Sequence, residues 1–175
     1  MSYKEAINYD INGDIKNAIN LYNDCIKNND HAEEAYSNLI VLLIELNFDY
    51  GVSSYFVGRK VFTENEMLNL STLLNDLLES SVKKFPNTNE FVFWKFYCEN
   101  FYKEYSRAKI LDIVQANEKS LIPYFYLYTN DLTSKIPVNH YMSKITELKD
   151  ILMKTPISKN KYILSLIDSS EKRAK

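Results

Sequence analysis

The chain has 175 residues, of which 46% are hydrophobic and 14% aromatic, and its formal net charge is −2 at pH 7. This length supports one sizeable core, and the three glycines and four prolines are too few for the many tight turns of a β-sandwich or the glycine-rich loops of nucleotide-binding α/β folds. Because Lys alternates with Asp and Glu along the chain, we expect neither direct nucleic-acid binding nor attraction to an anionic membrane.

Apolar residues recur at spacings of three and four throughout the chain, which predicts about ten amphipathic helices. The predicted helices run in chain order from Tyr3 to Ile11, from Ile15 to Ile26, over about 32–46, from Val52 to Phe62, from Met67 to Val82, through the aromatic segment 90–105, from about Ser106 to Asn117, over YFYLYTNDL after Pro123, between Pro137 and Pro156, and around Ile163 to Ile167.

Several predicted helix ends carry recognisable capping motifs. Ser2 with Glu5, and Thr63 with Glu66, have the spacing of a capping box, in which the N-cap hydroxyl and the carboxylate satisfy each other's backbone amides. Asn12-Gly13-Asp14 ends the first helix and caps the second, since glycine adopts the left-handed conformation easily and aspartate is a good N-cap.

The connections between predicted helices are short, so neighbouring helices must pack antiparallel. We therefore predict an all-α fold built from an array of helical hairpins, forming a single domain over residues 1–168. The charged residues 169–175 are predicted to be a disordered tail. The N-terminal stretch MSYKEAINYD is polar, and no apolar run approaches the roughly 20 residues that cross a bilayer. We expect a soluble cytoplasmic protein without membrane attachment.

Residues 3–30 have the small and large residue spacing of a tetratricopeptide repeat, and the stretch GDIKNAINLYNDCIK carries most of the match. The residues that carry it are Ala6, Tyr9, Gly13, Ala18, Tyr22 and Cys25. A second unit over about 33–62 resembles the repeat more loosely, through Tyr36, Leu39, Leu43, Val52 and Phe56.

The middle of the chain resembles the half-a-tetratricopeptide variant of this repeat. The matching positions are Trp94-Lys-Phe-Tyr97, then Arg107-Ala108-Lys109-Ile110 in inverted order, then Pro123, and then Phe125-Tyr-Leu-Tyr128. Most of the family's prolines and several of its small positions are absent. The resemblance implies a short right-handed superhelix of stacked hairpins and a binding scaffold without catalysis, and for the half-repeat variant a place in RNA-processing complexes.

The segment EFVFWKFYCENFYKEY holds eight aromatic residues in sixteen, including the only tryptophan. Lys95, Glu99 and Lys103 fall on one stripe of a helix at four-residue spacing, so we interpret the remaining arc as core. Residues at the edge of that stripe, together with two tyrosines of the next hairpin, could line a partner groove. The predicted partner-binding residues are Lys95, Glu99, Tyr102, Lys103, Tyr124 and Tyr128.

Catalytic and metal-binding patterns find little support in the sequence. His31 and His140 lie at helix starts with no second ligand at metal-binding spacing. Cys25 and Cys98 fall in helical patterns, and we interpret them as free core thiols in a reducing compartment. The acidic residues of the first turns are interpreted as favourable to the helix dipole and not as acid and base pairs; these are Glu33, Glu34, Glu64 and Glu66.

We therefore expect no cofactor, no metal and no enzymatic activity. The leading hypothesis is an interaction module that binds a peptide or protein in a groove of the helical stack, as an adaptor, a chaperone or an immunity-type inhibitor. The alternatives are a scaffold of an RNA-processing complex and an enzyme whose site is not recognisable from sequence. The sequence makes no prediction of the oligomeric state.

Overall fold

The computed structural model describes residues 2–101, 106–116 and 120–174, with backbone only for 50–52. All regular structure in these ranges is helical. The elements are α1 (Tyr3–Ile11), α2 (Ile15–Asn28), α3 (Ala32–Phe48), α4 (Tyr50–Gly58), α5 (Glu64–Lys84), α6 (Asn89–Glu99), α7 (Arg107–Ala116), α8 (Ile122–Thr133), the short 3-10 helix η1 (Asn139–Tyr141), α9 (Met142–Leu152) and α10 (Ser158–Arg173). The predicted all-α class and the predicted number of helices are confirmed.

The predicted caps hold the helix ends in the structure. The Ser2 amide donates to the Glu5 carboxylate at 2.6 Å. The Thr63 amide donates to Glu66 at 2.7 Å, and the Glu66 amide donates back to the Thr63 hydroxyl at 3.1 Å. Gly13 has the left-handed φ of +76° that ends α1. Helix α10 continues to Arg173, beyond the predicted domain end at residue 168, because Lys172 and Arg173 suit the negative end of a helix dipole.

The chain divides into two compact units: unit 1 comprises Met1–Phe85 and Ile157–Lys159, and unit 2 comprises Pro86–Pro156 and Asn160–Lys175. The single domain predicted over residues 1–168 stays a prediction. None of the helices in the described part of the chain combines the length and the apolar composition needed to cross a bilayer.

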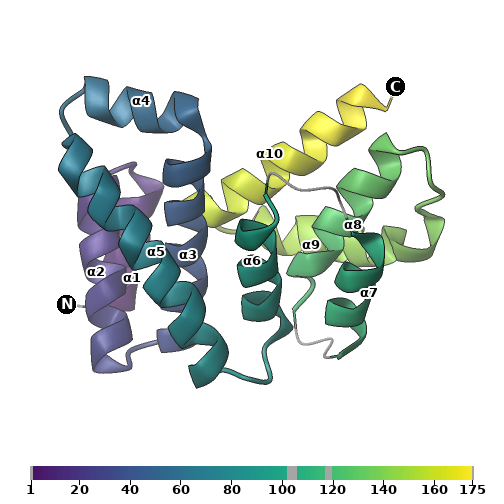
Figure 1. Ribbon diagram of the computed structural model, residues 1–175, viewed down its shortest axis with the longest axis horizontal. Helices are drawn as coiled ribbons and strands as arrows, with labels where there is room; N and C mark the ends of the chain where they lie inside the picture. The colour runs from purple at the N-terminus through teal and green to yellow at the C-terminus, as the bar shows by residue number, and fades with distance from the viewer. Residues whose placement is uncertain (1, 102–105, 117–119, 175) are drawn as a thin grey trace. The chain divides into compact units, whose positions relative to one another are not determined.

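Unit 1 is built around α3. Helix α1 packs on α2, α2 on α3, and α3 on both α4 and α5. Figure 1 shows α1, α2 and α3 next to one another, with α5 crossing them and α4 lying across one end. Every side chain from Leu39 to Ile44 is buried. A helix that is apolar on all sides is a buried helix, so LIVLLI makes α3 the centre of an aliphatic core.

Unit 2 has an aromatic core. Helix α6 packs on α7 and α8, and α8 packs on α7 and α9. The Phe93 and Phe125 rings meet edge to face with centroids 5.6 Å apart, and the Trp94 and Phe125 centroids are 5.9 Å apart. These three side chains and Phe91 are fully buried. The interpretation of the aromatic segment as core is therefore confirmed for Phe91, Phe93, Trp94 and Tyr97, whereas Val92 is exposed.

Candidate functional site

The predicted partner-binding residues do not gather at one exposed edge. Lys95 and Glu99 form the expected pair on α6, with Nζ and Oε1 3.9 Å apart. Tyr124 and Tyr128 on α8 are buried. Tyr102 and Lys103 lie outside the described residues, and a binding role for this set stays a prediction.

Tyr128 is committed to an internal hydrogen bond. Its hydroxyl donates to Glu171 on α10 at 3.0 Å, and Lys149 on α9 donates to the same carboxylate oxygen at 2.7 Å. Burial, followed by the neighbouring Glu171 carboxylate, raises the pKa of Tyr128 to about 12. The hydroxyl therefore ties α8 to α10 inside unit 2.

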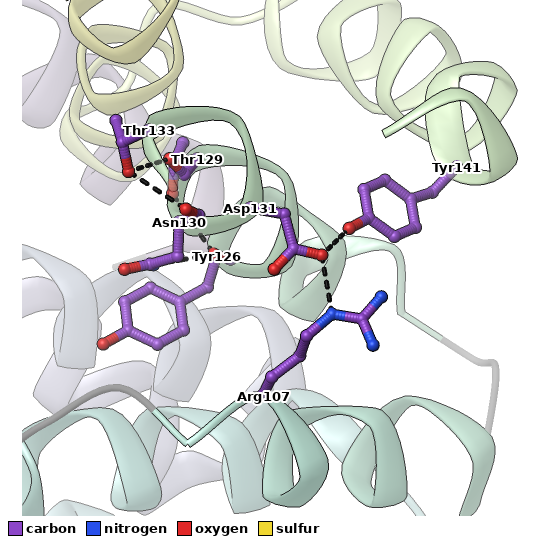
Figure 2. A network of polar contacts seen from close by, with 7 residues as sticks. All are labelled: Arg107, Tyr126, Thr129, Asn130, Asp131, Thr133 and Tyr141. Carbon is purple, nitrogen blue, oxygen red and sulfur yellow. Dashed lines mark hydrogen bonds and ion pairs between the residues drawn. The ribbon is translucent and has the colours of Figure 1, made fainter. Parts of the chain in front are cut away.

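The strongest cluster of charge in unit 2 surrounds Asp131, a fully buried residue of α8. Figure 2 shows Arg107 of α7 and Tyr141 of η1 converging on one oxygen of this carboxylate. The Arg107 Nε donates to Oδ2 at 2.8 Å, and the Tyr141 hydroxyl donates to the same oxygen. Hydrogen bonding to Asp131 raises the pKa of Arg107, and burial raises the pKa of Tyr141 to about 12.

This arrangement joins α7, α8 and η1 through one buried carboxylate. Hydrogen bonds between charged groups, such as the one from the Arg107 guanidinium to Asp131, are stronger than those between neutral groups. Nearby polar side chains on α8 bond within their own helix: the Asn130 amide donates to the Tyr126 carbonyl at 2.8 Å, and the Thr133 hydroxyl donates to the Thr129 carbonyl at 2.9 Å. We interpret the cluster as a structural contact that connects α7, α8 and η1.

A second buried aspartate, Asp10 of α1, plays a similar role in unit 1. It accepts from the Tyr22 hydroxyl at 2.9 Å, and from the Ser158 amide and hydroxyl at 2.8 and 2.6 Å. The Asn38 amide of α3 donates to the Tyr3 hydroxyl at 2.9 Å. Among the described residues, every fully buried side-chain nitrogen or oxygen has a hydrogen-bond partner. The buried polar groups are thus accounted for by folding.

The cysteine and histidine side chains lie in packing contacts with their neighbours. Cys25 is buried and Cys98 half-buried, and both are free. Burial raises the pKa of both thiols, that of Cys98 to about 12. The His31 ring stacks on Tyr3, with centroids 4.9 Å apart, and His140 lies exposed beside Tyr141. A search of the described part of the chain for three or more His, Cys, Asp or Glu side chains close enough to share a metal ion finds none.

A groove of about 630 Å³ lies between α4 and the first half of α5, beside the end of α3. We call it the α4–α5 groove. It is lined by Leu46, Asn47, Ser53, Ser54, Val57, Gly58, Glu64, Met67, Leu68 and Ser71. Its volume lies in the range of roughly 300–1,000 Å³ that ligand sites occupy.

The groove exists because of how α4 is connected. After α3, the chain turns at once into α4, which packs on α3, and the return helix α5 also packs on α3. The facing positions on α4 and α5 carry small residues, including Ser54, Gly58 and Ser71, and these leave the space between the helices open. A Cβ built on Gly58 meets no heavy atom within 4 Å.

Sequence reasoning missed this groove, although a signal was present. The segment VSSYFVG places two serines and a glycine among residues that are otherwise apolar. Leu68 is an apolar residue on the otherwise polar face of α5. In the structure Leu68 is 71% exposed. Small residues on one helix opposite an exposed apolar residue on the next indicate an incompletely filled interface.

A smaller hollow of about 280 Å³ lies over α1 and α2, lined by Glu5, Tyr9, Asn17, Asn20, Leu21 and Asp24. Glu5 is already used in the capping box, and Asn17 donates to Asp14 at 2.8 Å. This hollow is a surface depression between two helices, and the α4–α5 groove is the better candidate site.

Comparisons of the chain with protein-family models, with curated proteins and with solved structures give no match.

Proposed function

We propose that this chain is a non-catalytic protein-interaction module that holds a segment of a protein partner in the α4–α5 groove. The single observation that carries the proposal is the groove itself, a hollow of about 630 Å³ with a mixed polar and apolar lining that includes an exposed leucine, Leu68. An exposed apolar residue beside a cavity of this size is typical of a protein or ligand contact.

We further propose that the helices form a short tetratricopeptide-like stack of hairpins acting in the cytoplasm. Packing in the first hairpin supports this, since Ala6 and Ala18 are fully buried where the repeat requires small residues. The left-handed Gly13 between α1 and α2 fits the same pattern. Two free cysteines are consistent with a reducing compartment.

The test is a selection of binding peptides from an unbiased displayed library on the full-length protein. Gly58→Trp places a bulky ring on a residue that lines the groove, at a position where an added Cβ meets no heavy atom within 4 Å. Asn69→Trp adds the same ring on an exposed position of α5 that does not line the groove, so it is the matched control.

We expect selected peptides to lose about tenfold or more in affinity on Gly58→Trp, because the added ring occupies space that the peptide needs, and to keep wild-type affinity on Asn69→Trp. Failure to select any peptide, or equal binding to both variants, would refute the proposal.

A further inference from the structure

The residues along the groove define which class of segment fits it, and this inference rests on the proposed function. On α5, the lining residues Glu64, Met67, Leu68 and Ser71 recur at spacings of three and four. On α4, Ser53, Ser54, Val57 and Gly58 do the same. Each set forms one face of its helix, so two helix faces flank the groove.

This geometry discriminates between the usual modes of peptide recognition. An extended strand needs an unpaired sheet edge, and the groove walls are helices whose backbone groups bond within themselves. A polyproline segment needs an aromatic groove, and an acidic or phosphorylated segment needs an arginine cluster. Among the lining residues whose side chains the structure describes, there is neither an aromatic residue nor an arginine. We therefore expect the groove to accept a helix of the partner, packed between α4 and α5.

The apolar lining sets the contact face of that helix. Val57 lies on the α4 side and Met67 and Leu68 lie on the α5 side, whereas Leu46 is almost fully buried. Methionine adapts its shape to a partner, and the serines and Gly58 allow a helix backbone to approach closely. The matching ligand carries apolar side chains at positions i, i+4 and i+7.

Charge fixes the orientation of the ligand. Glu64, in the first turn of α5, is the one charged side chain among the described lining residues, and it is exposed. The neighbouring cation Arg59 is held over the Tyr55 ring, 5.5 Å from its centroid, and does not line the groove. A basic residue of the ligand is therefore favoured at the end of the groove beside Glu64.

We propose that the α4–α5 groove binds an amphipathic α-helix of a protein partner, with an apolar stripe facing Val57, Met67 and Leu68 and a lysine or arginine beside Glu64.

The test uses synthetic peptides and the full-length protein. The probe is a peptide of about 15 residues, long enough for an isolated helix to form, with an alanine-rich scaffold, leucines at i, i+4 and i+7, and a terminal lysine at one end of the stripe. A second peptide has glutamate in place of that lysine. A third has the same composition with a central proline that breaks the helix. Binding is measured by fluorescence anisotropy, and helicity by circular dichroism.

We expect the lysine peptide to bind most tightly, and the proline peptide about tenfold or more weakly. Glu64→Gln should reduce the preference for lysine over glutamate by about two- to fivefold, the size of an exposed ion pair. Gly58→Trp should abolish binding, and Asn69→Trp should leave it unchanged.

Two results would overturn the inference. One is equal binding of the helical and proline peptides, and the other is no binding of any of the three peptides at millimolar concentration. In either case peptides from the unbiased library that depend on Gly58 would preserve the proposed function with another class of ligand, so the two failures are distinguishable.

Discussion

Each unit buries an aspartate, yet the partners differ. Asp10 in unit 1 is held by neutral donors, the hydroxyls of Tyr22 and Ser158 and the Ser158 amide. Asp131 in unit 2 shares its charge with the Arg107 guanidinium and also accepts from Tyr141. A carboxylate can thus be buried either with dipoles alone or with a counter-ion, and the second arrangement leaves a charge behind when the carboxylate is removed.

The two units also differ in the side chains that fill their cores. Unit 1 is filled by aliphatic side chains on α3, whereas unit 2 is filled by rings from α6 and α8. Aromatic pairs add directional contacts of about 0.5–1.5 kcal/mol to the burial of area. We expect unit 2 to depend on fewer and larger side chains.

The largest loss is expected from Trp94→Ala. Removal of a fully buried indole should lower the free energy of unfolding by about 3–5 kcal/mol. Hydrogen exchange measured by NMR should show the loss of protection first in α6 and α8. Leu42→Ala in α3 is the counterpart in unit 1, and a pattern of exchange identical to that of Trp94→Ala would contradict the contrast between the two cores.

Asp131→Ala comes next. The change leaves Arg107 and Tyr141 without their acceptor, and the expected loss is about 3 kcal/mol, the low end for a broken buried pair because Arg107 is about one third exposed. Urea unfolding followed by Trp94 fluorescence measures it. The double variant Asp131→Ala/Arg107→Met should recover part of the loss, and no recovery would show that the residual charge is not the cause.

Asp10→Ala should cost less, about 1–3 kcal/mol, since only neutral donors lose an acceptor. Ser158→Ala removes one of those donors and should cost about 1 kcal/mol. The same urea experiment, followed by circular dichroism, compares the two. A loss for Asp10→Ala greater than that for Asp131→Ala would reverse the ranking of the two aspartates.

The smallest effect concerns an exposed carboxylate. Hydrogen bonds from Lys16 and then Thr63 lower the pKa of Glu66 from its ordinary 4.5 to about 2. A lowered pKa contributes stability above the unfolded value, and that stability is lost as the pH falls from about 4.5 to 2. An NMR titration should place the carboxyl midpoint well below 4, and Lys16→Met should move it upward. An unchanged midpoint in that variant would exclude Lys16 as the main cause.

Local chemistry made the helix ends predictable. Ser2, Gly13 and Thr63 act on residues within a few positions of themselves, so their effects can be seen in the sequence. The burial of Tyr124 and Tyr128 could not be predicted in this way. Helical periodicity does not show whether a tyrosine hydroxyl will find an acceptor such as Glu171. The α4–α5 groove could not be located from the sequence either. It depends on α4 and α5 both packing on α3, and this tertiary packing is not visible in helical periodicity.

The contact between Asp10 and Ser158 joins residues 148 positions apart in sequence. A ribosome adds about 5–20 residues per second, so the first hairpin emerges several seconds before the segment that completes its polar network. During that interval the Asp10 carboxylate lacks its two Ser158 donors, and α1 is held by α2 and by the hydrogen bond from Asn38 of α3 to Tyr3. Unit 1 is therefore expected to reach its final stability only late in translation.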